Sequence, residues 1–131
     1  AVVEFALVLP LFMLLLLASV EFGRAYFDLH LLTSAAREGA RVGSLPGSLE
    51  DDVSDAVDEF LQGVGLSGNW TTVVTVTTPD SIPRAGGLAE AQEGDRVAVE
   101  VTYDFSVLAG TIIPGFRGVV PMRGRCVFRH E

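Results

Sequence analysis

The apolar residues of this chain gather at its N-terminal end. Phe5 to Val20 is a run of sixteen residues without a charged side chain, whereas the remainder mixes polar and apolar positions. A membrane-spanning helix needs about 20 apolar residues, or about 17 at the short end. The run therefore predicts a minimal membrane span whose ends lie near Glu4 and Glu21. Pro10 is expected to kink this helix without breaking it, because the freed carbonyl can find another partner in a membrane or a packed bundle.

The helical pattern continues beyond the apolar run. No turn signal occurs before Gly39 and Gly43, so we predict one helix from near Val2 to near Val42, roughly 60 Å long. One stripe of this helix is small and apolar and is predicted to pack on a sheet: Ala25, Leu29, Leu32, Ala36, Gly39 and Gly43. A second apolar set points elsewhere: Phe22, Tyr26, Phe27 and Leu31. One stripe suffices to dock a sheet, so the second face is predicted to meet a membrane, a partner or other copies. The alternative is a single core helix that its own domain covers.

The remaining two-thirds of the chain predicts a small α+β head. Ser48 resembles an N-cap followed by an acidic turn, and apolar residues recur at helical spacing to Gly63, which indicates a short helix over residues 48–63. Three β-like runs follow, at residues 70–78, 96–107 and 119–129. Their alternation predicts a half-buried antiparallel sheet of about three strands. The fold class is thus α+β, with a long helix over residues 1–43 packed on a small antiparallel sheet and a globular head over residues 44–131.

Several details of the head follow from the same alternation. The arginines of the last strand are expected to find partners among the acidic outer positions of the middle strand. Cys126 is in phase with Met122 and Phe128, which predicts a reduced thiol buried against the helix. Residues 79–95 form a long loop that is either mobile or an interaction surface. Residues 108–118 are turn-like yet apolar, so that Ile112, Ile113 and Phe116 need cover from the helix or from a neighbour.

Composition and charge narrow the function classes. Of 131 residues, 49% are hydrophobic and 20% charged, which fits one small domain or one domain with an appendage. The net charge is −8, with nine arginines and no lysine, and this argues against a nucleic-acid binder. Two histidines and one cysteine cannot supply a four-ligand zinc site, a redox pair or an internal disulfide. We predict no catalytic residue, no metal site and no cofactor.

The remaining candidates for chemistry have plainer explanations. Asp51, Asp55 and Glu59 share one helix face without a calcium loop, so a solvated acidic face is expected. His30 and His130 lie at distant positions of the sequence, and a nucleophilic pair with Cys126 would need an improbable convergence. No phosphate-binding glycine motif occurs. The sequence therefore predicts a protein that is not an enzyme.

Glu4 heads the apolar run, where a carboxylate is costly unless it is paired. The order of features along the chain resembles that of type IV pilin-like proteins: a start of small residues, then Glu4-Phe5, a long apolar helix and a β-rich head. More closely, AVVEFALVLPLFMLLLLASVEFGRAYF with the following LTSAAREGARVG resembles the TadE-like family of Flp/Tad pilus pseudopilins. The final strand, which ends in MRGRCVFRHE, is similar to the last strand of that family.

The resemblance implies a bacterial prepilin that is inserted in the inner membrane, cut by a prepilin peptidase and assembled with other pilins into an extracellular filament. The family's motif places Glu fifth and Phe sixth after the cut, so Glu4 and Phe5 carry over if one residue precedes Ala1. A secretory signal peptide is the alternative, although no positively charged segment precedes the run. The partners implied are other copies of the chain or other pilins, the inner-membrane assembly machinery, the peptidase and the membrane before assembly.

These observations predict a structural pilin-like subunit whose assembly residues include Glu4, Phe5, Pro10, Phe22, Tyr26, Phe27 and Leu31. The favoured partner of Glu4 is an amino terminus, because Arg24 lies roughly 30 Å away along the helix. Major and minor (priming) roles both remain open. The rival hypothesis is a membrane-tethered binding module that recognises a ligand without polymerising, with residues 79–95 and 108–118 as its contact loops.

Overall fold

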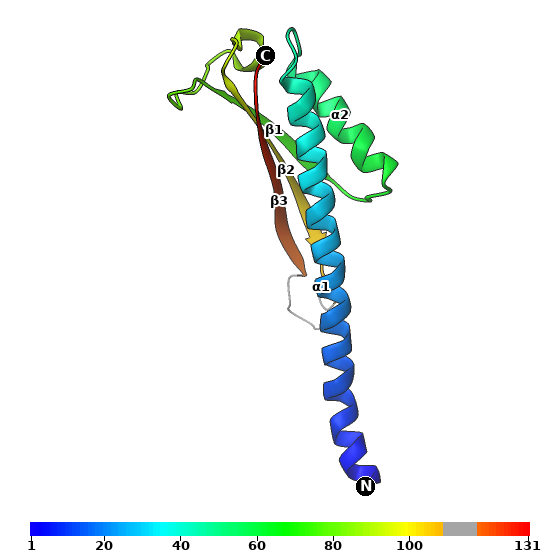
Figure 1. Ribbon diagram of the computed structural model, residues 1–131. Helices are drawn as coiled ribbons and strands as arrows, with labels where there is room; N and C mark the ends of the chain where they lie inside the picture. The colour runs from blue at the N-terminus through cyan, green and yellow to red at the C-terminus, as the bar shows by residue number, and fades with distance from the viewer. Residues whose placement is uncertain (109–117) are drawn as a thin grey trace.

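The computed structural model describes residues 1–108 and 118–131. Its elements, in chain order, are α1 (Val2–Gly43), α2 (Glu50–Gly63), β1 (Trp70–Thr77), the 3₁₀ helix η1 (Gly87–Glu90), β2 (Arg96–Ser106) and β3 (Val119–Arg129). Figure 1 shows that the C-terminal half of α1 lies within the head, whereas its N-terminal half projects beyond it. The predicted long helix and α+β class are confirmed. Ile112, Ile113 and Phe116 lie outside the described residues.

The three strands form one antiparallel sheet in the order β1-β2-β3. Val99 of β2 lies opposite Val74 of β1 and Cys126 of β3. The helix-facing residues of β2 are all buried: Val97, Val99, Val101, Tyr103 and Phe105. On the outer face, Glu100 lies opposite Arg125 in the register but forms its ion pair with Arg123, at 3.4 Å. The alternation of the sequence therefore predicts both the strands and the face that packs.

Both helices pack on the same side of the sheet. At Gly39, a Cβ atom would lie 2.7 Å from Val57 of α2 and 3.3 Å from Val99 of β2, so α1 meets both neighbours there. Farther along, the indole N–H of Trp70 in β1 donates a hydrogen bond to Asp58 of α2 at 2.6 Å. The core is built where the C-terminal half of α1, the apolar face of α2 and the middle strand converge.

The backbones of α1 and the sheet come close together at Gly124 of β3. A Cβ atom at this position would overlap the backbone of Leu32. Gly124 lies opposite Val101 in the register, on the helix-facing side. The helix thus crosses the edge strand with its backbone directly against the strand, and only a residue without a side chain fits between them.

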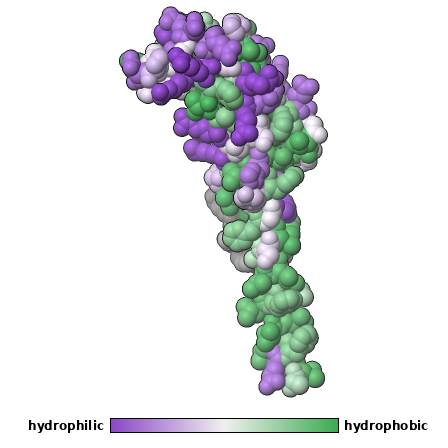
Figure 2. Space-filling view, viewed as in Figure 1, coloured by the Kyte–Doolittle hydropathy of each residue, from purple (hydrophilic) through white to green (hydrophobic). Residues whose placement is uncertain are grey.

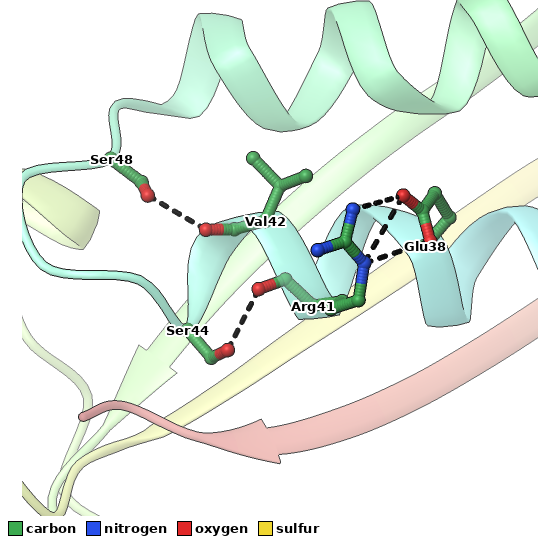
Figure 3. Close-up of polar contacts among 5 residues, drawn as sticks. All are labelled: Glu38, Arg41, Val42, Ser44 and Ser48. Carbon is green, nitrogen blue, oxygen red and sulfur yellow. Dashed lines mark hydrogen bonds and ion pairs between the residues drawn. The ribbon is translucent and has the colours of Figure 1, made fainter.

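The C-terminal end of α1 is capped by side chains from the turn that follows. The hydroxyl of Ser44 donates to the carbonyl of Arg41, and that of Ser48 donates to the carbonyl of Val42, each at 2.7 Å (Figure 3). Arg41 also pairs with Glu38 one turn earlier. The last carbonyls of a helix lack partners within the helix, and these contacts satisfy two of them. The predicted role of Ser48 as the N-cap of the next helix is wrong. Instead α2 begins at Glu50, and Asp52 accepts the N–H of Leu49 at 2.8 Å.

A polar cluster holds residues 79–95 and the C-terminus against the end of α1. The guanidinium of Arg84 donates two hydrogen bonds to the carboxylate of Asp95, at 2.8 and 3.2 Å. Asp95 also accepts the backbone N–H of Gln92. These hydrogen bonds, chiefly that from Arg84, hold the pKa of the Asp95 carboxyl below its ordinary value. The buried ring of His130 lies 3.1 Å from the carbonyl of Gly43. Residues 79–95, predicted to be a mobile or interacting loop, are therefore tied into the head.

Two predictions about burial need correction. Cys126 faces the helices, but it is half-buried rather than buried, and its neighbour Phe128 is 37% exposed. The reason is that β3 is an edge strand, so side chains on it gain cover from one neighbouring strand only. Leu29, predicted to pack on the sheet, keeps 39% of its surface exposed. It lies beside an open groove rather than in the core. Leu32, Ala36, Gly39 and Gly43 of the same stripe are buried.

Candidate assembly site

The N-terminal half of α1 is an apolar surface that the head does not cover. The helix is long and apolar enough to cross a membrane, and no residue of its most hydrophobic window is buried. Figure 2 shows this half as a nearly continuous hydrophobic shaft below a largely hydrophilic head. Pro10 lies within an uninterrupted helix, and Phe5 is exposed. An exposed apolar surface of this size marks a site of contact with lipid or with another protein.

Glu4 interrupts this surface close to its end. Its carboxylate lies 3.3 Å from the amino group of Ala1, and its side chain is 87% exposed. An ion pair this exposed adds little to stability. The same carboxylate would become costly if the helix entered an apolar bundle without a positive partner. The contribution of Glu4 therefore depends on what surrounds the helix.

An apolar groove of about 650 Å³ lies where the shaft meets the head. Its helical wall comes from α1 and includes Leu14, Leu17, Ala18, Glu21, Ala25 and Leu29. The opposite wall comes from the ends of β2 and β3 and from the residue just after β2: Phe105, Val107, Val120 and Met122. Among the described residues of this lining, Glu21 is the one ionisable side chain apart from the phenol of Tyr26. The groove is continuous with the exposed shaft, because Leu14, Leu17 and Ala18 belong to both.

Glu21 joins the two walls of the groove. One oxygen of its carboxylate accepts the backbone N–H of Leu108 at 3.0 Å and lies 3.4 Å from the guanidinium of Arg24. That guanidinium is stacked over the ring of Phe105 at 5.2 Å. The second oxygen is buried and has no hydrogen-bond partner among the residues the structure describes. Glu21 is thus a buried carboxylate that fastens the chain just beyond β2 to α1.

The structure separates the second apolar set into two groups. Phe22 and Tyr26 are exposed and line the groove, and Tyr26 packs edge-on against His30 at 4.4 Å. Phe27 and Leu31 lie on another side of α1, beside Tyr103 and the residues that follow α2. There the hydroxyl of Tyr103 donates to the carbonyl of Ser67, and burial raises the pKa of this phenol. The four residues therefore do not form one surface.

The groove includes residues that the sequence did not single out. Glu21 was expected at a membrane interface, and its burial depends on a partner 87 positions later in the chain. Val120 and Met122 were identified only as strand residues. The alternation of β2 and β3 was the available signal, since Phe105 and Val120 are paired in the register on the helix-facing side. Across residues 1–108 and 118–131, no group of acidic, histidine or cysteine side chains could hold a metal ion.

Comparison with known proteins bears on the helix alone. The model of the TadE-like protein family matches residues 1–41. No curated protein and no solved structure gives a significant match to the chain. The match covers nearly all of α1 and none of the head. The N-terminal segment is therefore TadE-like, as its resemblance implied. Together with the apolar helix, this match fits a membrane-anchored protein associated with Tad pili.

Proposed function

We propose that this protein is a structural, pilin-like subunit. The N-terminal half of α1 anchors it in the bacterial inner membrane, a prepilin peptidase processes it, and it then assembles with other copies or other pilins. In the assembled state, α1 lies in the core of an extracellular type IV or Tad pilus filament and the head is displayed outside. The subunit either builds such a filament or primes it. The observation that carries the proposal is the unburied apolar half of α1, which projects beyond a head with its own core.

The energetics of transfer support this proposal. Moving apolar side chains from lipid to a bundle of similar helices keeps them out of water, so that extraction from the membrane costs little hydrophobic free energy. Packing between helices and the pairing of Glu4 can then decide the equilibrium. A filament also places each head at the surface, where its acidic residues remain solvated.

The first test is to locate the protein in its host. Filaments are sheared from cells, purified and examined by negative-stain microscopy and immunoblotting. The proposal expects the full chain in the filament fraction, and its ratio to other pilins distinguishes a major from a minor subunit. If filaments form but the chain stays wholly in the membrane fraction, the structural role is wrong. A tethered binding module that does not polymerise is then the better explanation.

The second test replaces Glu4 by glutamine. Glu4→Gln is expected to leave membrane insertion and the head intact but to reduce incorporation into filaments by about tenfold or more, the change that 1.4 kcal/mol produces. The matched control is Glu59→Gln, because Glu59 is exposed on α2 of the head. Incorporation of Glu4→Gln at the wild-type level would mean that Glu4 is only an interfacial residue.

A further inference from the structure

The residues that the structure describes present two exposed apolar surfaces of opposite curvature. One is convex: the exposed helical run from Phe5 to Val20. The other is concave: the groove between α1 and the ends of β2 and β3. We propose that the groove receives the Phe5 to Val20 run of a second copy of this chain. The proposal rests on the proposed function, because it identifies the surface of one subunit that holds the anchor helix of the next.

The chemistry of the groove suits one face of an apolar helix. Its volume of about 650 Å³ is that of a small-molecule site, which admits a few aliphatic side chains but not a whole helix. The sheet wall presents Phe105, Val120 and Met122, and Glu21 is the lone carboxylate among the lining residues in the described part of the chain. The run brings no charge to this contact, so that no new buried ion is created by docking.

The two described walls of the groove are tied to each other before anything docks. Its helical wall and its sheet wall are joined by the hydrogen bond from the N–H of Leu108 to Glu21. Arg24, which pairs with Glu21, packs over Phe105 of the sheet wall. Because these contacts hold both walls, little conformational freedom has to be lost when a second helix arrives.

The symmetry of the contact follows from the use of two different surfaces. A run docked in a groove is a heterologous contact, which generates rings or open helical filaments rather than closed dimers. Copies inserted in one membrane share one orientation, so the two α1 helices are parallel. The groove lies alongside residues 14–29 of α1, whereas the run spans residues 5–20. The second copy is therefore displaced by nine residues, or about 14 Å along the axis.

Two adjacent valines of β3 allow a matched test. Val119 and Val120 are 56% and 47% exposed, but they face opposite sides of the sheet, and Val120 alone lines the groove. In full-length protein with the native thiol removed by Cys126→Ser, a copy carrying Val120→Cys is co-expressed with copies carrying single cysteines between residues 5 and 16. Oxidation of whole cells, in which a subunit can leave the bilayer as it assembles, is followed by non-reducing electrophoresis. Val120→Cys is expected to form disulfides at positions three or four residues apart, and Val119→Cys at none.

A second pair of variants tests the consequence for assembly. Val120→Asp is expected to reduce incorporation into filaments at least tenfold, whereas Val119→Asp is expected to keep it near the wild-type level. Circular dichroism of both variants in detergent verifies that the head remains folded. Should Val120→Asp misfold, the cysteine pairs still decide the question in an otherwise unchanged chain.

The outcomes separate this inference from the proposed function. Normal filaments containing Val120→Asp, with no disulfide from Val120→Cys, overturn the groove contact while the pilin role stands. The same holds when Val120→Cys reacts only with a lipid-soluble maleimide, since lipid then fills the groove. If the wild-type chain never enters filaments but the disulfides form, the groove contact stands and the filament role fails. Equal disulfide formation at Val119→Cys and Val120→Cys also overturns the specific contact.

Discussion

The two halves of α1 differ in the size of their apolar side chains. The C-terminal half buries alanine and glycine at Ala35, Ala36, Gly39, Ala40 and Gly43, together with Leu32. The N-terminal half presents mainly leucine, valine and phenylalanine, and none of its most hydrophobic window is buried. Small residues let the helix backbone approach α2 and the sheet closely. The difference teaches that side-chain size, more than hydropathy, separates the part of α1 that packs within the chain from the part left for other partners.

The division of α1 into a packed half and a free half would fail if the head needed the N-terminal half in order to fold. Removal of residues 1–20, which keeps Glu21 and its contact with Leu108, is expected to give a soluble, folded and monomeric head. The core residues lie from Leu32 onward, so none of the buried apolar side chains is lost. Size-exclusion chromatography and circular dichroism test this directly. A truncated chain that aggregates or lacks a cooperative thermal transition would show that the two halves are not separable.

Two leucines on the same helix sharpen the comparison. Leu32 is fully buried, whereas Leu16 is 44% exposed. Leu32→Ala is expected to lower the free energy of unfolding of the head by about 2–5 kcal/mol, the range for a truncated core leucine. Leu16→Ala is expected to change it by less than about 0.5 kcal/mol, as surface substitutions do. Denaturation in detergent gives both values. A similar loss from the two substitutions would contradict the division of α1.

The position of Gly124 tests how closely the buried half packs. Gly124→Ala places a methyl group against the backbone of Leu32, which cannot move without shifting the helix. Overpacking of this kind costs about 1–3 kcal/mol. Gly63→Ala is the control, because a Cβ atom there meets nothing within 4 Å. A variant at position 124 as stable as the wild type would mean that α1 does not cross β3 at this residue.

Much of the fold could be predicted from local patterns, and the groove could not. The helix from Val2 and the three strands follow from periodicity, because the spacing of apolar residues within each element shows which of its faces is buried. The burial of Glu21 depends on the return of Leu108 from a distant strand, and the crossing at Gly124 depends on which strand lies under the helix. His130 meets Gly43 across 87 positions of sequence. Such contacts are set by topology, which the alternation of a single strand does not contain.

The smallest expected effect concerns the end of the buried half, where Asp95 and Arg84 hold residues 79–95 near the C-terminus. The pKa of Asp95 is lower in the folded state than its ordinary value of 3.8, mainly because of the hydrogen bond from Arg84. A depressed pKa means that the folded state favours the ionised carboxylate. This stabilisation is complete above the ordinary pKa and is lost as the pH falls below about 3.8 through the folded value.

Asp95→Asn is therefore expected to lower stability at pH 7 and to weaken the loss of stability between about pH 4 and pH 2. Asp55→Asn, on the exposed face of α2, serves as the control for acid sensitivity in general. Urea midpoints measured at successive pH values test the prediction. Because the carbonyl of Asp95 accepts the N–H of His130, whose ring lies beside Gly43, acid should loosen α1 first at its C-terminal end, while hydrogen exchange in residues 5–20 stays unchanged. If acid lowers the stability of Asp95→Asn and of the wild type by the same amount, the acid-sensitive contact lies elsewhere in the head. Faster hydrogen exchange in the N-terminal half at low pH would show that the two halves of α1 are coupled.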